Sequence, residues 1–233
     1  MDKPPVKPSD SNNHGAPQLW SFCTDDALER LGLPACWHTY PAGVRLFSQG
    51  DPARDVYIIG SGIAKLSSVS EDGREVIVGL RGRGHILGVS AALVDTPHRA
   101  AATMVSDCRL YRMSAADLRG GSEYGQALSP YLLRLHAYES LEATSEAADS
   151  GPRQAQRRLR QFLFQIAQAI KNGGSARSGM LPLPLTQWEI AQLLHVTPQY
   201  LSAKLVPVLE KEGLIVRRQK RLLLVVDRIT DSR

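Results

Sequence analysis

Two segments near the C-terminus carry side chains that suit hydrogen bonding better than core packing. In TQWEIAQLLHVTPQYLSAKL (residues 186–205), Thr197, Gln199 and Tyr200 stand at the start of a predicted helix. In IVRRQKRLLLVV (residues 215–226), a basic turn separates two apolar runs. Amide and hydroxyl groups can hydrogen-bond to base edges, and arginine or lysine can bind phosphates. These segments could therefore bind nucleic acid.

The first segment holds the start and stop signals of two short helices. Thr186 and Glu189 have the spacing of a capping box. His195 falls in the tight turn that follows, where positive φ is needed and histidine tolerates it better than most residues. Thr197 can cap the second helix, and Pro198 then takes the first helical position, where its missing N–H costs nothing. The pattern predicts a helix–turn–helix followed by a basic β-hairpin, or wing.

The second helix is predicted to have one buried and one polar side. Gly213 ends it, and Pro207 in its interior should kink or bulge it because proline removes a backbone donor and crowds the preceding turn. The expected buried stripe comprises Leu201, Leu205, Val208 and Leu209.

We expect two kinds of contact with double-stranded DNA. The N-terminal residues of a recognition helix reach base edges, and glutamine can bind adenine with two hydrogen bonds. The first helix and the wing are better placed for phosphates. The expected DNA-binding residues are Thr186, Gln187, Thr197, Gln199, Tyr200, Ser202, Lys204, Arg217, Arg218, Lys220 and Arg221.

Net charge separates the C-terminal third from the rest of the chain. Residues 1–151 hold 14 Lys and Arg against 18 Asp and Glu, a net charge of −4. Residues 152–233 hold 14 against 5, a net charge of +9. A basic domain joined to an acidic remainder is typical of a nucleic-acid-binding domain fused to a domain of another function. The alternative, a solvated basic face, is disfavoured because the charge gathers on the wing.

Length and composition indicate a two-domain globular protein. With 233 residues, 43% of them hydrophobic and 22% charged, the chain can bury two cores. No apolar run approaches the ~18 residues that span a bilayer, and the start lacks the apolar core of a secretory signal. We expect a cytoplasmic protein with no membrane partner, whose residues 1–23 form a disordered tail.

Residues 38–113 have the texture of an antiparallel β domain. Short runs rich in Val, Ile, Tyr and Leu alternate with glycine-bearing turns at a spacing of roughly 8–12 residues. EDGR (71–74) is suited to a hairpin turn, and Ser114 can cap a helix that follows the strands. The predicted fold class is α+β, with an antiparallel, jelly-roll-like β-roll over residues 24–127.

A helix over about residues 129–148 follows this domain, and its leucines and tyrosines recur near heptad spacing. That spacing favours a coiled-coil seam between two subunits, and the alternative is a helix packed on its own β domain. Gly151 and Pro152 suit a helix end and a new helix start. We expect a dimerisation helix and hinge over 128–150 and a DNA-binding domain over 151–233. The seam residues are Leu128, Tyr131 (or Leu132 in its place), Leu135, Tyr138 and Leu141.

Over almost everything after the tail, the chain resembles the CRP/FNR superfamily, the catabolite-activator and fumarate–nitrate regulator family of bacterial transcription factors. PAGVRLFSQGDPARDVYIIGSGIAKL resembles the opening strands of the family's cyclic-nucleotide-binding-type β-roll. DGREVIVGLRGRGHILG resembles its central hairpin and the start of its effector pocket, and TQWEIAQLLHVTPQYLSAKLVPVLEKEGLI its DNA-binding motif. The resemblance implies an effector-controlled homodimer that binds a palindromic operator and contacts RNA polymerase.

The pocket departs from the family's pattern. Members that bind cyclic AMP have Gly-Glu after the pocket strand, and the glutamate holds the ribose 2′-hydroxyl; this chain has Gly88-Val89. Where they have Arg-Ser or Arg-Thr for the cyclic phosphate, this chain has His98 and Arg99. Valine accepts no hydrogen bond, so a buried ribose hydroxyl would be left unpaired at a cost of about 1–3 kcal/mol. We expect a pocket for an effector other than cyclic AMP, or for none; its identity stays unknown.

The recognition helix departs as well. The family often has Glu-x-x-Ser-Arg there, with the glutamate and arginine reading bases, whereas this chain reads QYLSAK (199–204). From Thr197 to Gly213 the segment is one residue longer than the usual pattern. We therefore expect an altered target sequence.

Three cysteines are too few for the iron–sulfur cluster of the family's oxygen sensors, which needs four. Cys108, inside an apolar strand, is expected to be core, while Cys23 and Cys36 could pair or respond to oxidants. No histidine pair has a metal-ligand spacing. We predict no cofactor and no metal site.

Two other classes of protein remain open. An enzyme is disfavoured because the chain has no Gly-x-Ser-x-Gly elbow and no phosphate-binding Gly-Lys-Ser. GRGHILG (82–88) has the wrong spacing for a dinucleotide fingerprint and precedes no clear helix, so we expect no catalytic residues. A ligand-binding β-roll module without DNA binding is the alternative function, and the intact wing disfavours it.

Overall fold

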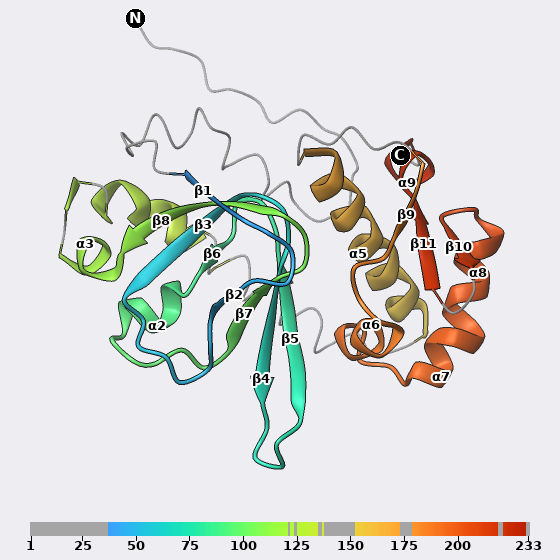
Figure 1. Ribbon diagram of the computed structural model, residues 1–233, viewed down its shortest axis with the longest axis horizontal. Helices are drawn as coiled ribbons and strands as arrows, with labels where there is room; N and C mark the ends of the chain where they lie inside the picture. Colours follow the sequence, from blue (N-terminus) through green and yellow to red (C-terminus); the bar gives the residue numbers. More distant parts are fainter. Residues whose placement is uncertain are drawn as a thin grey trace, which may run out of the picture.

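The structure is a computed structural model that describes residues 37–120, 122–123, 125–134, 137, 152–172, 179–218 and 221–231. Figure 1 shows a β-rich N-terminal part beside a mainly helical C-terminal part. The predicted tail, Cys23 and Cys36 lie outside the described residues. Among the helices that the structure does describe, none is both long and apolar enough to cross a bilayer.

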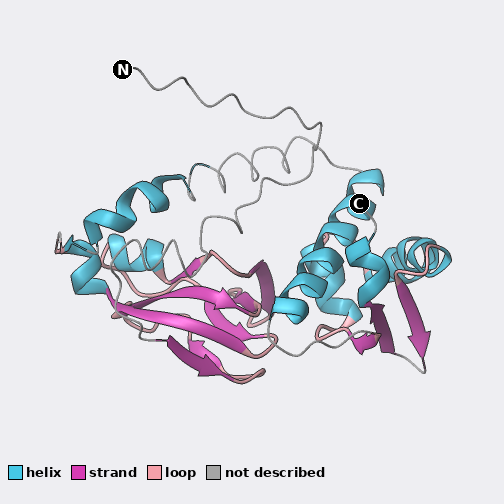
Figure 2. Ribbon diagram, turned by 90° about the horizontal axis from the view of Figure 1, so that it is seen from above, coloured by secondary structure: helices cyan, strands magenta, loops and turns pink. Residues whose placement is uncertain are grey.

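The N-terminal part consists of two four-stranded antiparallel sheets (Figures 1 and 2). One has the order β1-β8-β3-β6, with β1 Trp37–Tyr40, β8 Cys108–Ser114, β3 Asp55–Ser61 and β6 Ile86–Leu87. The other has the order β2-β7-β4-β5, with β2 Arg45–Phe47, β7 Ala101–Met104, β4 Ala64–Val69 and β5 Glu75–Arg81. The predicted EDGR turn joins β4 to β5, and the N–H of Ser70, the residue before it, donates to the Arg74 carbonyl over 2.9 Å.

The two sheets share one core. Ile59 of β3 and Leu110 of β8 pack with Ala102 and Met104 of β7, and all four are almost fully buried. Cys108 belongs to the same cluster at 1% exposure, as predicted. Burial raises the pKa of its thiol to about 11, so the sulfur stays protonated and unreactive. The alternation of inward apolar and outward polar residues thus produced the predicted β-roll.

Three helical segments close the ends of this domain. Helix α2 (Val89–Leu93) begins directly after β6, so the expectation that no clear helix follows GRGHILG was wrong. Helix α3 (Ala115–Arg119) is capped by Ser114, whose hydroxyl accepts from the Ala116 N–H over 3.0 Å. Residues 125–134 form a further helix, which packs against the sheet carrying β1.

The C-terminal part places helices around a small antiparallel sheet. Helix α5 buries one face, with Leu159, Leu163 and Ile166 almost fully covered, as its amphipathic pattern predicts. The three-stranded sheet has the order β10-β11-β9. The elements are α5 Pro152–Asn172, β9 Met180–Pro182, α6 Gln187–Leu193, α7 Pro198–Tyr200, a π-helical turn Leu201–Leu205, α8 Val206–Lys211, β10 Ile215–Arg218, β11 Arg221–Val225 and α9 Val226–Asp231.

Candidate functional site

The helix–turn–helix is formed by the capping interactions that its sequence predicts. The Thr186 hydroxyl accepts from the Glu189 N–H over 3.2 Å, and the Glu189 carboxylate accepts from the Thr186 N–H over 2.8 Å. His195 has a φ of 53° in the turn. Thr197 then caps α7 by accepting from the Tyr200 N–H over 3.1 Å. Both helix starts and the turn are therefore as predicted.

The second helix is not a continuous α-helix. It begins as α7, widens into the π-helical turn over Leu201–Leu205, and continues as α8. The Val206 N–H donates to the carbonyl of Leu201, five residues earlier. Pro207 is the second residue of α8, so the bulge predicted from this proline lies just before it in the chain.

The π-helical turn corrects one predicted core position. Val206 is 1% exposed and packs in the C-terminal core, whereas Val208, predicted to be buried, is half-buried. The wider turn rotates every residue after it, so Val206 replaces Val208 in the stripe. Leu201, Leu205 and Leu209 are buried as predicted.

The expected DNA contacts on the recognition helix differ in exposure. Gln199 and Lys204 are exposed, as is Thr197, while Tyr200 and Ser202 are half-buried. On the preceding helix, Thr186 is exposed and Gln187 half-buried. Figure 1 draws α7 and α8 along the edge of the C-terminal part that faces away from the β-roll. Gln199 and Lys204 are therefore the long polar side chains best presented to a ligand.

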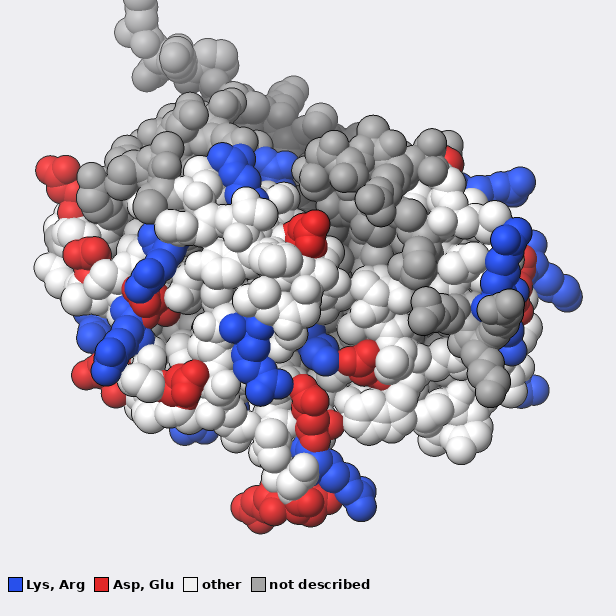
Figure 3. Space-filling view, in the orientation of Figure 1, with Lys and Arg blue, Asp and Glu red and all other residues white. Residues whose placement is uncertain are grey.

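The wing is the hairpin of β10 and β11, with Arg218 paired to Arg221 next to its turn. Arg218 is exposed; Lys220 lies outside the described residues, as does the side chain of Arg221. Arg217 instead turns toward the recognition helix, where its Nη2 donates to the Ser202 carbonyl over 3.5 Å. Figure 3 shows basic side chains gathered at the right-hand edge, where Figure 1 places β10, β11 and α8.

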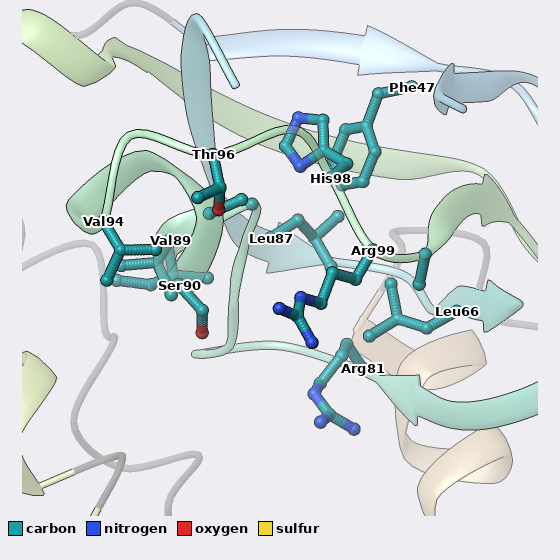
Figure 4. Close-up of a pocket in the computed structure, with 14 residues that line it drawn as sticks. Phe47, Leu66, Arg81, Leu87, Val89, Ser90, Val94, Thr96, His98 and Arg99 are labelled. Carbon is teal, nitrogen blue, oxygen red and sulfur yellow. The ribbon is translucent and has the colours of Figure 1, made fainter. Parts of the chain in front are cut away.

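A cavity of about 260 Å³ lies in the β-roll beside α2. Val89 of α2 lines it at 5% exposure, so an apolar side chain stands where a ribose acceptor is expected. Figure 4 shows Arg81 and Arg99 with their guanidinium groups on the same side of the cavity. None of the described residues that line it carries a carboxylate: they are Phe47, Leu66, Arg81, Ile86, Leu87, Gly88, Val89, Ser90, Ala91, Val94, Thr96, His98, Arg99 and Ala100.

Gly88 and His98 shape the wall of this cavity rather than its charge. The His98 ring stacks on Phe47, with ring centroids 3.8 Å apart, and His98 is 5% exposed. Burial lowers its pKa, although Asp51 opposes the shift, so the ring is neutral at physiological pH. Gly88 has a φ of 81°, and a Cβ there would lie 2.9 Å from the His98 ring. Of the four predicted pocket residues, Arg99 alone carries a charge. Arg81 also lines the cavity, although the sequence did not predict it.

A direct contact joins the strands of the pocket to the helix–turn–helix. Lys65 of β4 and Glu189 of α6 form an ion pair with Nζ and Oε1 2.7 Å apart, both side chains less than 20% exposed. Burial raises the pKa of Glu189, but hydrogen bonds from Lys65 and Thr186 outweigh it and hold the pKa below its ordinary value. The Gln192 amide oxygen also accepts from the Ile77 N–H of β5 over 3.0 Å.

The predicted subunit seam is only partly described. Leu128 is buried in the core of its own β-roll, and Tyr131 packs there with its hydroxyl donating to the Gly84 carbonyl. Leu128 and Tyr131 therefore pack on their own β domain, which is the alternative to a seam between two subunits. Leu133, on the described part of the helix, is 73% exposed. Leu135, Tyr138 and Leu141 lie outside the described residues.

Comparison with known proteins matches both parts of the chain. Residues 37–121 match the family described as "Cyclic nucleotide-binding domain", and residues 157–229 match "Crp-like helix-turn-helix domain". Together these matches cover about two thirds of the 233 residues.

Two curated relatives and one solved structure illustrate the similarity. The CRP-like cAMP-activated global transcriptional regulator of Mycobacterium tuberculosis is 29% identical over 71% of this chain and 74% of its own. The nitrogen fixation regulation protein FixK of Azorhizobium caulinodans is 28% identical over 85% of this chain and 77% of its own. The structure of FixK2 from Bradyrhizobium japonicum has the same fold, with a TM-score of 0.60 at 21% identity over 85% and 97% of the two chains. The chain belongs to the CRP/FNR family of DNA-binding transcription regulators.

Proposed function

We propose that this protein is a cytoplasmic homodimer that reads a palindromic DNA operator with its recognition helices and is controlled through the cavity of its β-roll. The observation that carries the DNA-reading part is the pair of capped helices, with Gln199 exposed at the start of the second and a basic hairpin beside it. The residues proposed to touch DNA are those named from the sequence, and Arg217 contributes mainly by bracing the helix.

The test of DNA binding is an electrophoretic shift on the DNA upstream of the protein's own gene, repeated on scrambled DNA. We expect a retarded band whose affinity falls steeply as salt rises, because bound lysines and arginines release counterions from phosphates. The same band should be weaker on scrambled DNA. A salt-insensitive interaction, or none with either DNA, would leave the alternative of a ligand-binding module without DNA binding.

The dimer is proposed to form through residues 128–148. Two recognition helices would then read half-sites about 34–36 Å apart. The exposed Leu133 supports an apolar contact on this helix. Leu135→Asp and Tyr138→Asp should give monomers in sedimentation, whereas Leu93→Asp, at an exposed leucine on α2, should leave the dimer intact. A parent protein that is monomeric at micromolar concentration would rule out this seam.

We further propose that the cavity takes a small anion with an apolar portion, and that cyclic AMP is not the effector. Arg81 and Arg99 supply two positive charges at one side, while Leu66, Leu87 and Val89 supply an apolar wall. The cAMP-activated relative suggests the nucleotide, but the buried Val89 would leave a ribose hydroxyl unpaired.

Thermal-shift and calorimetric titrations separate these possibilities. Octanoate or inorganic phosphate should raise the melting temperature of the parent, and Arg99→Ala should remove that increase. Arg83→Ala is the matched control, since Arg83 does not line the cavity. Micromolar binding of cyclic AMP together with enhanced DNA affinity would overturn the assignment.

A ligand in the cavity has a short route to the DNA-binding helices. Leu66 and Arg81 line the cavity, and their chain neighbours Lys65 and Leu80 contact the C-terminal part. A shift of β4 or β5 on ligand binding would therefore change the contact with α6, which positions the recognition helix. Control of DNA affinity through this contact is part of the proposed function.

A further inference from the structure

The buried side of the recognition helix has irregular spacing. Its fully covered residues are Leu201, Leu205, Val206 and Leu209, at intervals of four, five and eight from the first. Removing one residue between Leu201 and Leu205 would give intervals of three, four and seven, the stripe of an ordinary amphipathic α-helix. The helix therefore holds one residue more than its core contacts need, and the π-helical turn over Leu201–Leu205 accommodates it.

The surrounding structure stabilises this turn. Pro207 has no N–H to donate back into the turn, which leaves a carbonyl there without its helical donor. The Ser202 carbonyl accepts instead from Arg217 Nη2, and Arg217 Nε lies 3.5 Å from the Glu210 carboxylate. Arg217 thus links the π-helical turn to the wing. Pro207 also favours the wider turn, because a regular α-helix cannot accommodate proline at this position.

The extra residue changes what the outer side presents. An α-helix has 3.6 residues per turn, and the π-helical turn, whose hydrogen bonds join residues five apart, has more than four but fewer than five. The position one turn beyond Gln199 therefore falls between Ala203 and Lys204. Gln199, Ala203 and Lys204 are all exposed. Ala203 is too small to shield its neighbour. Within the described part of the chain, Lys204 donates to no group of its own protein, unlike Lys65, which is paired with Glu189.

We infer that Lys204 is a second base-reading residue beside Gln199, and that the π-helical turn keeps it on the outer side by accommodating the extra residue. This inference rests on the proposed DNA-reading function. Lysine reads guanine through its O6 and N7 acceptors, so Lys204 would specify a G·C pair next to the pair read by Gln199. Bulges of this kind occur frequently at functional sites.

The test compares the sequences that each protein selects from random DNA. Lys204→Ala should lose selection at one base pair per half-site, a drop of roughly 5- to 150-fold in discrimination there. Lys204→Arg should keep it, since arginine reads the same acceptors. Lys211→Ala, at an exposed lysine near the end of the same helix, should leave the selected sequence unchanged.

Deleting Ala203 tests the role of the turn. The deletion is made together with Pro207→Ala, because proline would break a regular helix there. It then preserves the buried stripe with α-helical spacing, so the protein should fold with unchanged far-UV circular dichroism. Lys204 would then stand four residues after Gln199, about one α-helical turn, and keep its place relative to the buried stripe, so selection at its base pair should be retained. A deletion variant that folds but loses selection at this base pair would overturn the inference.

Two further outcomes are separable. A parent protein that selects no sequence at all contradicts the proposed function as well as this inference. A parent that selects a site while Lys204→Ala weakens specific and scrambled DNA equally contradicts the inference alone, and would make Lys204 a phosphate contact.

Discussion

The recognition helix and the β-roll cavity both depart from the usual residues of the family, but in different ways. The recognition helix is one residue longer than the usual pattern, and the π-helical turn accommodates the extra residue. Leu201, Leu205 and Leu209 are buried, so the extra residue alters the outer side of the helix. In the cavity Gly88 and the His98–Phe47 stack form part of the wall, while Val89 places an apolar side chain where the family's cyclic-AMP binders have a glutamate. In both regions buried residues hold the backbone in place, and the side chains that would contact a ligand differ from the family's usual ones.

Truncating a buried leucine in each region should have the largest effect. Leu201 and Leu87 are each at most 1% exposed, so Leu201→Ala and Leu87→Ala should each lower the free energy of unfolding by about 2–5 kcal/mol. Urea denaturation measures this. DNA binding should be lost with Leu201→Ala and retained with Leu87→Ala. If Leu201→Ala kept parental stability and DNA affinity, the recognition helix would not depend on this core.

Two left-handed backbone positions give the next comparison. Gly88→Ala places a Cβ 2.9 Å from the His98 ring at a φ of 81°, and should cost about 1–3 kcal/mol while closing the cavity. His195→Gly removes the backbone strain of a non-glycine residue at a φ of 53°, but it raises the conformational entropy of the unfolded chain. These two effects on the free energy of unfolding should cancel to within about 1 kcal/mol. Equal losses in urea titrations of the two variants would contradict this difference.

The contact between the two regions should be weaker but measurable. Lys65→Met leaves the partly buried Glu189 without its cation, and should cost about 1–3 kcal/mol and reduce any effect of ligand on DNA affinity. Arg112→Met breaks the more exposed pair with Asp55, and should cost less than about 1 kcal/mol. If both variants lost the same stability and ligand control persisted in Lys65→Met, the ion pair would not join the regions.

The last comparison concerns pH. Burial lowers the pKa of His85 to about 4, helped by Arg81, against an ordinary value of 6.5. Between pH 6.5 and pH 4, His85 is protonated in the unfolded chain but neutral in the folded protein. The free energy of unfolding is therefore highest above about pH 6.5 and decreases as the pH falls toward 4. His85→Gln should flatten the dependence of unfolding free energy on pH in that window. An unchanged slope would mean that His85 is not held neutral.

Local signals in the sequence predicted the DNA-binding end well. The hydroxyls of Thr186 and Thr197, the φ of His195 and the position of Pro198 depend on near neighbours, so they can be inferred from a few residues. Pro207 indicated a bulge, but not that Val206 would replace Val208 in the core, because that depends on which side of the helix meets α5 and the sheet.

The cavity and the contact between the regions were harder to predict. Lys65 and Glu189 are 124 residues apart, and no local pattern marks them as partners. Arg81 lines the cavity because β5 passes beside Arg99, which is a property of the β-roll and not of the LRGRG segment itself. Nor could heptad spacing alone distinguish a seam from own-chain packing at Leu128, since both need a leucine.

The most direct test of the central claim compares Gln199→Ala with Arg218→Ala on a specific site and on scrambled DNA over a salt series. Gln199→Ala should cost about 1–3 kcal/mol on the specific site only, relaxing preference at one base pair per half-site. Arg218→Ala should weaken binding to both DNAs alike and lower the salt slope by about one. Equal weakening of both DNAs by Gln199→Ala would contradict base reading by the start of this helix.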